Sequence, residues 1–145
     1  ALEAAHPADP VVHSLAARAA EAAGEIPQAL AHLDRGIAAN PMEALFHAEK
    51  ARLLGAAASS TAALEALRRA IELDPASEQY RLEAARLLIS LGKPREALAE
   101  LDAALHTSPG FHDVYRTYLK VEELRAELLR TLSPEPLTAS ATDLR

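Results

Sequence analysis

Hydrophobic residues recur along the chain at steps of three and four positions, the spacing of one face of an α-helix. Prolines divide this pattern at regular intervals, because Pro7, Pro41, Pro75 and Pro109 are separated from one another by 34 residues. Proline lacks an amide donor and forces the residue before it out of helical geometry, so each of these prolines is expected to end a helix. The pattern therefore predicts a chain of helices built from a repeated unit.

Small residues and leucines recur in the same register. The small residues are Ala17, Ala51 and Ala85, then Ala29, Ala63 and Ala97, then Gly36, Ala70 and Ala104, and the leucines are Leu33, Leu67 and Leu101. Small side chains let two helix axes approach to about 8 Å, and leucines fill the space that remains between them. Each unit is expected to be a pair of helices that buries its apolar face against the next pair.

The expected helices alternate between the first and the second member of each pair. The first helices span residues 10–23, 44–57 and 78–91, and the second helices span residues 27–39, 61–73 and 94–107. Asp9, which precedes Pro10, and Ser77 are of the residue types that cap a helix N-terminus. The chain thus contains its own signals for where these helices begin.

Turns between paired helices carry a further signal. Gly24 and Gly92 lie at such turns, where a left-handed backbone conformation favours glycine. The turn of the second unit has no glycine after Gly55, and we expect Ser60 or Thr61 to close it as the cap of the following helix.

A seventh helix is expected over residues 111–132. Its apolar face comprises Phe111, Val114, Tyr115, Tyr118, Val121, Leu124, Leu128 and Leu132. A repeat array needs a terminal cap over its last hydrophobic face, and this helix is the candidate. Residues 1–9 resemble the end of a second helix, which suggests an extension cut from a longer array. Residues 133–145 show no periodicity, and we expect an extended tail.

The 34-residue unit resembles the tetratricopeptide repeat, and the three units are residues 10–43, 44–77 and 78–110. They read His13, Ala16, Ala17, Ala20, Ala29, Leu33, Gly36 and Pro41, then His47, Lys50, Ala51, Leu54, Ala63, Leu67, Ala70 and Pro75, then Arg81, Ala84, Ala85, Leu88, Ala97, Leu101, Ala104 and Pro109. The small and proline positions match, whereas His, Arg, Ala or Leu replace the large aromatic residues of the family. The resemblance implies an all-α fold, an α-solenoid of three helix hairpins and a capping helix wound as a right-handed superhelix.

Composition and charge narrow the function classes. The chain has 34 alanines, 24 leucines and only five aromatic residues, which favours helices over a β-sandwich or barrel. The absence of cysteine excludes disulfides and thiolate chemistry, and fits the cytoplasm, which we favour slightly, or the periplasm. The net charge of −6 disfavours a nucleic-acid partner, and no apolar run is long enough for membrane insertion. The excess of alanine, and of arginine over lysine, suggests bacterial coding.

Motifs of catalytic chemistry are missing from the sequence. It contains no phosphate-binding loop, dinucleotide-binding glycine turn, nucleophile elbow or H-E-x-x-H pair. His13 and His47 lie one period apart, but two imidazoles without a carboxylate at a third corner make a poor metal site. The sequence therefore predicts neither cofactor nor metal, and it argues against an enzyme.

One column of cations is the candidate binding site. Arg18, Arg52 and Arg86 share one position of the repeat, and Lys120 has the equivalent place in the capping helix. The resemblance implies that this position faces the concave surface where members of the family bind ligands. By the same resemblance, the residues around the cations also face this surface. They are Val11, Ser14 and Glu21 in the first unit, Leu45, Ala48 and Gly55 in the second, and Gln79, Leu82 and Ile89 in the third. Because a guanidinium group can bond both oxygens of a carboxylate, the column favours an acidic segment of a partner protein.

A structural interpretation of the same column competes with this one. Each cation has an acidic residue three positions away, in the pairs Arg18 and Glu21, Arg52 and Glu49, Arg86 and Glu83, and Lys120 and Glu123. Such pairs form on exposed helices without any ligand. In family modules that grip chaperone tails, donors stand where this chain has Ser14, Glu49, Gln79 and Glu83, which argues against that partner.

The function that the sequence favours is a non-catalytic scaffold that binds an extended or helical segment of another protein in its concave groove. Two alternatives stay open. The chain could be an excised docking or regulatory segment of a larger enzyme of the glycosyltransferase, sulfotransferase or hydroxylase type. It could also be an assembly module that forms a homodimer through residues 111–132.

Overall fold

A computed structural model of the protein describes residues 9–107 and 112–133, and for residues 112–118 it describes the backbone only. Seven helices and no strand occur within these ranges. The helices are α2 (Pro10–Ala22), α3 (Ile26–Ala39), α4 (Ala44–Ala56), α5 (Ser60–Leu73), α6 (Glu78–Ser90), α7 (Pro94–His106) and α8 (His112–Leu132). Each begins and ends within one residue of the expected range. The fold is all-α, and the expected segments 1–8 and 134–145 lie outside the described residues.

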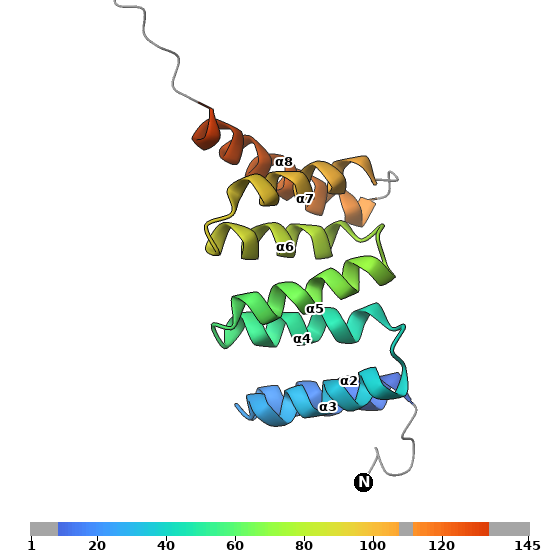
Figure 1. Ribbon diagram of the computed structural model, residues 1–145. Helices are drawn as coiled ribbons and strands as arrows, with labels where there is room; N and C mark the ends of the chain where they lie inside the picture. Colours follow the sequence, from blue (N-terminus) through green and yellow to red (C-terminus); the bar gives the residue numbers. More distant parts are fainter. Residues whose placement is uncertain (1–8, 108–111, 134–145) are drawn as a thin grey trace, which may run out of the picture.

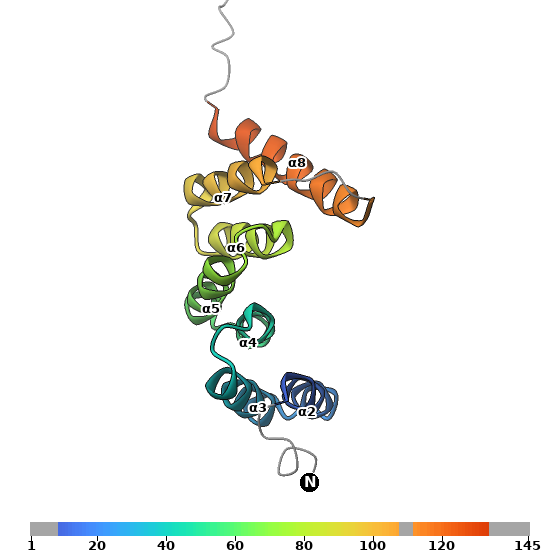
Figure 2. The same ribbon diagram turned by 90° about the vertical axis from the view of Figure 1, so that its right-hand side faces the viewer.

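The helices form antiparallel hairpins that stack into a solenoid. Figure 1 shows α2 to α7 as successive rungs, with α8 packed on α7 at the end of the stack. In Figure 2 the first helices of the hairpins (α2, α4 and α6) lie on one side and the second helices (α3, α5 and α7) on the other. The first helices follow the inner side of a shallow curve that α8 extends.

Two of the three predicted helix starts are confirmed, and one is wrong. The carboxylate of Asp9 accepts a hydrogen bond from the amide of Val11 at 2.9 Å, and the hydroxyl of Ser77 accepts one from the amide of Tyr80 at 3.4 Å. In the second hairpin, however, α5 begins at Ser60 itself, and its N-cap is Ser59 without a side-chain hydrogen bond. The cap is one residue earlier than predicted because the turn closes through the backbone.

The backbone of this turn explains how it forms without glycine. Gly24, Ala58 and Gly92 are 34 residues apart, and all three have a left-handed backbone with φ of 78°, 59° and 71°. Each amide donates to a carbonyl three residues earlier. An alanine at this position is strained, since a Cβ crowds the backbone in the left-handed region. The second hairpin thus keeps the geometry of its neighbours at a cost in stability.

Polar side chains occupy the column of His13, His47 and Arg81, where the tetratricopeptide pattern would have a large aromatic residue. His47 Nε2 donates to the carbonyl of Pro41 at 3.3 Å, and in the next unit Arg81 donates to the carbonyl of Pro75 through Nε and Nη2 at 3.4 and 3.3 Å. These side chains bind the loop that leads into their own helices. Arg81 Nη1 also donates to Glu100 of α7 at 3.0 Å, which ties α6 to its partner helix.

The apolar core is divided into two parts, and α4 contributes to both. The first core contains Ala17, Ala20, Ala29, Leu33, Phe46 and Leu53. The second contains Ala48, Ala51, Leu64, Leu67, Ala70, Leu82, Ala84, Ala85, Leu88, Ala97, Leu101, Ala104, Val121 and Leu128. The predicted columns of alanine and leucine therefore form the core, as their register requires. The boundary between the two cores follows the junction of the first hairpin with the second.

The closest approach at this junction is between Phe46 and Gly36. Phe46 is 1% exposed, and a Cβ placed on Gly36 would lie 2.8 Å from both Cε1 and Cζ of its ring. In the other two hairpins the position of Gly36 carries Ala70 and Ala104. Glycine is needed at the first junction because the ring occupies the volume that a methyl group would take.

Helix α8 closes the second core with part of its predicted apolar face and leaves two other leucines exposed. Val121 and Leu128 are 1% and 6% exposed, and Arg125 Nε donates to Asp102 of α7 at 2.5 Å. Leu119 and Leu129 are 43% and 36% exposed. The side chains of the predicted apolar positions 111–118 lie outside the described residues. Self-association through this helix stays a hypothesis.

We predict that Gly36→Ala lowers the free energy of unfolding. Helix propensity favours the alanine by about 1 kcal/mol. The overpacking cost against Phe46, about 1–3 kcal/mol, should exceed this gain because the ring is buried on all sides. Gly55→Ala is the matched control, since its Cβ would meet only Leu87 and Ala63, at 3.8 and 3.9 Å. Urea denaturation should show the control more stable than the wild type and Gly36→Ala less stable. Equal gains in both variants would contradict the close contact.

We also predict that Ala58→Gly stabilises the protein by about 0.5–1 kcal/mol, because relief of left-handed strain exceeds the added entropy of the unfolded chain. The neighbouring Ala57 has φ of −83°, so Ala57→Gly should give no such gain. The midpoints of urea unfolding measure both changes. An Ala58→Gly variant no more stable than Ala57→Gly would show that the turn is unstrained.

Candidate functional site

Three of the four predicted cations line hollows between consecutive first helices. Arg18, Arg52 and Arg86 come from α2, α4 and α6, and Lys120 comes from α8, and all four side chains are exposed. Two hollows open between consecutive first helices, and residues of this column line both of them. Arg18 lines the first hollow, and Arg52 and Arg86 line the second.

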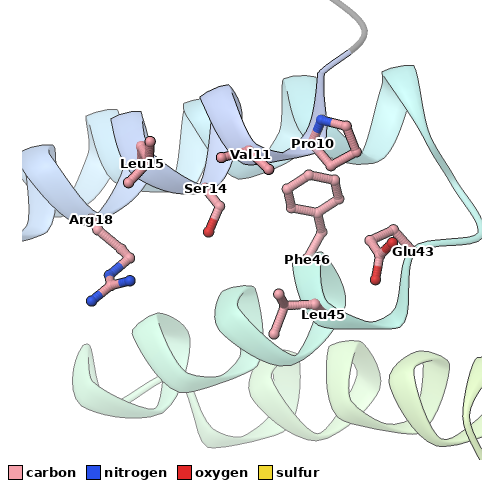
Figure 3. Close-up of a pocket in the computed structure, with 8 residues that line it drawn as sticks. All are labelled: Pro10, Val11, Ser14, Leu15, Arg18, Glu43, Leu45 and Phe46. Atoms are coloured by element: carbon pink, nitrogen blue, oxygen red, sulfur yellow. The ribbon is translucent and has the colours of Figure 1, made fainter.

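The first hollow lies between α2 and α4 and has a volume of about 330 Å³. It is lined by Pro10, Val11, Ser14, Leu15, Arg18, Glu43, Leu45 and Phe46 (Figure 3). Val11, Leu15 and Leu45 are 62%, 57% and 47% exposed, which is unusual for large aliphatic side chains grouped together. Figure 3 shows Arg18 at one end of the group and Glu43 at the other. The hollow is therefore apolar in its middle and charged at its ends.

The second hollow lies one repeat further along, between α4 and α6. It has a volume of about 190 Å³ and is lined by Ala51, Arg52, Gly55, Leu67, Glu83, Arg86 and Leu87. Its two arginines come from neighbouring helices. Its floor is provided by Leu67 of α5, which is fully buried. The hollow combines a small apolar floor with two cations and one carboxylate at the rim.

Arg52 is tied to the preceding hairpin and not to its own helix. Its Nη1 and Nη2 donate to the two carboxylate oxygens of Glu21 at 2.5 and 2.6 Å. The hydrogen bond from Arg52 lowers the pKa of Glu21, and the positive charges of Arg52 and Arg18 act in the same direction. The predicted local pair with Glu49 is wrong, because Glu49 instead accepts a hydrogen bond from Ser14 of α2 at 3.2 Å. For Arg52 and Glu49, the hydrogen-bond partner lies about one repeat away in the sequence and not one turn away on the same helix.

The other three cations of the column make no ion pair within the described part of the chain. Arg18, Arg86 and Lys120 have no carboxylate within 4.0 Å among the side chains described, those of residues 9–107 and 119–133. Glu83, the predicted partner of Arg86, accepts a hydrogen bond from Gln79 at 2.7 Å. The expected local ion pairs of these three residues are therefore absent from the structure, and their charges face solvent.

The remaining predicted groove residues divide into accessible and buried positions. Val11, Leu45 and Gln79 are exposed, and Ser14, Glu21 and Gly55 are half-buried. Ala48 and Leu82 are 7% and 1% exposed and belong to the second core, so they cannot contact a partner. Ile89 is half-buried against the same core. The prediction that Ala48 and Leu82 line the groove is therefore wrong, because α4 and α6 turn this position towards the neighbouring hairpin.

Four residues of the first hollow were missed by the sequence reasoning. Pro10, Leu15, Glu43 and Phe46 line it, yet none belongs to the predicted groove. A signal for Leu15 was present, because the other two repeats carry Glu49 and Glu83 at the same position. A leucine where the repeat otherwise places an acid indicates an apolar surface that the array does not bury.

Metal and membrane sites were also considered. No group of three or more His, Asp or Glu side chains within the described residues could hold a metal ion. His13 is buried, and His47 is engaged by the carbonyl of Pro41. Of the helices described, none is long and apolar enough to cross a membrane.

Comparison with known proteins was made at the level of sequence and fold. Residues 57–118 match the sequence profile of the tetratricopeptide repeat family. A search of curated proteins gives no significant match.

Three solved structures illustrate the likeness in fold. The type III secretion chaperone SycD of Yersinia enterocolitica, in complex with a peptide of the translocator YopD, is 15% identical with a TM-score of 0.75, covering 83% of this chain and 92% of that one. The TPR2B domain of yeast Sti1 in complex with pHsp70 is 20% identical with a TM-score of 0.72, covering 84% and 97%. The second TPR of Spaghetti (RPAP3), bound to the HSP90 peptide SRMEEVD, is 22% identical with a TM-score of 0.62, covering 68% and 92%.

At these identities the likeness concerns the fold, and it covers 68% to 84% of this chain. The match in sequence covers the end of the second hairpin, the third hairpin and the start of α8. The chain thus has the fold of tetratricopeptide repeat structures, and its residues 57–118 are similar in sequence to that family.

Proposed function

We propose that the chain is a non-catalytic interaction module that binds an extended, acidic segment of a partner protein along the inner side of α2, α4, α6 and α8. The observation that carries this proposal is the position of Arg18 and Arg86. Both guanidinium groups lack an ion pair within the described residues, and each lies beside an apolar hollow. A carboxylate of the partner would supply the missing charge, and neighbouring apolar side chains would fill the hollows.

The overall charge makes this arrangement selective. The chain has a net charge of −6, yet the column presents cations on one side of the first helices. An acidic segment is repelled by most of the surface and attracted to this strip, so the charges favour one place of binding. The strip is preformed on packed helices, and binding would order little backbone of the module.

The structures of similar fold support peptide binding in general terms. SycD and RPAP3 were solved with peptides of YopD and HSP90, respectively. We do not extend the chaperone partners to this chain, because Glu49 and Glu83 occupy positions where a terminal carboxylate would need donors. We propose instead that internal acidic side chains of the partner bind to the column.

Arg52 has a different role from the rest of the column. Its guanidinium group is already saturated by Glu21, and this ion pair joins α4 to α2. We propose that Arg52 fixes the distance between the two helices that border the first hollow, while Arg18 and Arg86 contact the partner.

The first prediction concerns the affinity for acidic peptides. Random peptide display on the wild type should enrich segments with Asp or Glu near an aliphatic residue. Replacing Arg18, Arg86 and Lys120 by Ala should weaken binding of the selected peptides about tenfold or more, because each exposed charge pair contributes about 0.2–1 kcal/mol. Fluorescence anisotropy at two salt concentrations measures the loss, and affinity for the wild type should fall as salt rises.

The control variant replaces Arg68, Arg69 and Arg95 by Ala, which removes the same charge from α5 and α7 on the other side of the array. It should bind as the wild type does. Equal losses in both triple variants would show only a general effect of net charge and would contradict a site on the inner strip.

A second prediction separates Arg52 from the column by pH. Arg52 holds the pKa of Glu21 below its ordinary value of 4.5, so this ion pair stabilises the fold above that pH and is lost as the pH falls through the lowered pKa. Arg52→Ala should therefore melt at a lower temperature than the wild type at pH 7, and the difference should shrink below pH 4.5. Arg86→Ala, which removes no ion pair, should melt as the wild type does at both pH values. A constant difference across this range would exclude the pair as its cause.

A further inference from the structure

The first hollow has a feature that a column of cations does not explain. One of its ends carries Arg18, and the other carries Glu43, while Val11, Leu15 and Leu45 lie between them. The ring of Phe46, buried in the first core, closes the hollow from below. A ligand that fills the hollow therefore meets a cation, an aliphatic surface and an anion in order.

Both charged ends are available to a ligand. Neither Arg18 nor Glu43 makes an ion pair within the described residues. Glu43 is the N-cap residue of α4, but its side chain makes no capping hydrogen bond there. Glu43 is a half-buried residue that lines the hollow, and its carboxylate lies at the end opposite Arg18. A cationic group of the ligand would pair with this carboxylate.

The length of the hollow follows from the helical register. Glu43 is the N-cap residue of α4, and the corresponding N-cap residue of α2 is Asp9. Arg18 lies nine residues after Asp9 along α2. Nine helical residues correspond to about 13 Å along the two helices. An extended chain advances about 3.3 Å per residue and covers this length in about four residues. The two charged ends are therefore matched by side chains about four positions apart in a bound segment.

We propose that the first hollow binds a peptide segment in which a large aliphatic side chain lies midway between an acidic and a basic side chain about four positions apart. The carboxylate pairs with Arg18, the aliphatic side chain enters between Val11, Leu15 and Leu45, and the basic group pairs with Glu43. This inference rests on the proposed function and specifies the chemistry of the segment at one place on the strip. The second hollow is smaller, and its one carboxylate, Glu83, lies three residues before Arg86 on the same helix and not at the opposite end, so it does not select the same pattern.

The test uses peptides of nine residues with the central sequence Lys-Ser-Leu-Ser-Glu and blocked ends. Three variants replace Leu by Ser, Glu by Gln or Lys by Gln. Fluorescence anisotropy with the full chain should show a loss of about tenfold or more for the first variant, because a buried leucine is lost. Each of the other two should lose about three- to fivefold, the range of a solvent-exposed charge pair.

Variants of the protein that replace one charged end of the hollow by a neutral side chain show which charged peptide residue binds at that end. Against Arg18→Gln, replacing the peptide's Glu by Gln should cause no further loss, while replacing its Lys should still weaken binding. Against Glu43→Gln the two results should be reversed. Arg86→Gln is the matched control, against which both peptide changes should act as they do with the wild type. Thermal melts verify that each variant is folded.

The outcomes separate this inference from the proposed function. If the Leu peptide and its Ser variant bind the wild type equally, or if the losses are the same against Arg18→Gln as against the wild type, the inference is wrong. If displayed acidic peptides still bind and depend on Arg86 in that case, the proposed function stands without it. If no peptide binds the wild type, both fail.

Discussion

The packing of Phe46 on Gly36 is the contact on which the first half of the array depends. The ring takes the place of a methyl group on α3, and it is the largest fully buried side chain of the first core. Its equivalent in the next repeat, Tyr80, is only half-buried against the core that contains Ala70. Because Gly36 has no Cβ, the ring of Phe46 can pack directly against α3 where the first two hairpins meet. The same ring closes the first hollow, so the packing of the core and the shape of the surface have one cause.

The junction between these hairpins is otherwise polar. Phe46 and Leu53 provide its apolar contacts from α4. Three polar pairs cross it, namely Arg52 with Glu21, Ser14 with Glu49, and Lys50 with Asp34 at 2.6 Å. The later junctions, by contrast, share one continuous apolar core that extends from α4 to α8. Since exposed ion pairs contribute little stability, the polar contacts serve mainly to fix geometry. Aliphatic side chains that a fully packed junction would have covered are left on the surface at the rim of the hollow.

Features that repeat every 34 residues could be predicted from the sequence, because each is set by the local chemistry of the backbone. Proline ends a helix and glycine permits a left-handed turn wherever they occur, and the columns of alanine and leucine determine which faces pack. The partners of individual side chains could not be predicted in this way. Glu49 lies one turn from Arg52, yet Arg52 binds Glu21, because the stacked helices bring residues 31 apart within 2.6 Å. Leu82 belongs to a column that includes the half-buried Ser14, but only the packed hairpins show that it is buried.

Ala58 and Leu15 illustrate two different ways in which a repeat departs from its own pattern. Ala58 breaks the glycine column and yet keeps the same backbone geometry, so the fold overrides the residue. Leu15 breaks an acidic column, and the fold leaves it exposed instead of burying it. A cation at the same position of every repeat attracts acidic chains without distinguishing among them, and salt screens that attraction beyond about 8 Å. Discrimination between acidic partners requires a feature that occurs once. In this array that feature is found where Leu15, Leu45 and Glu43 meet, at the one junction whose packing differs from the rest.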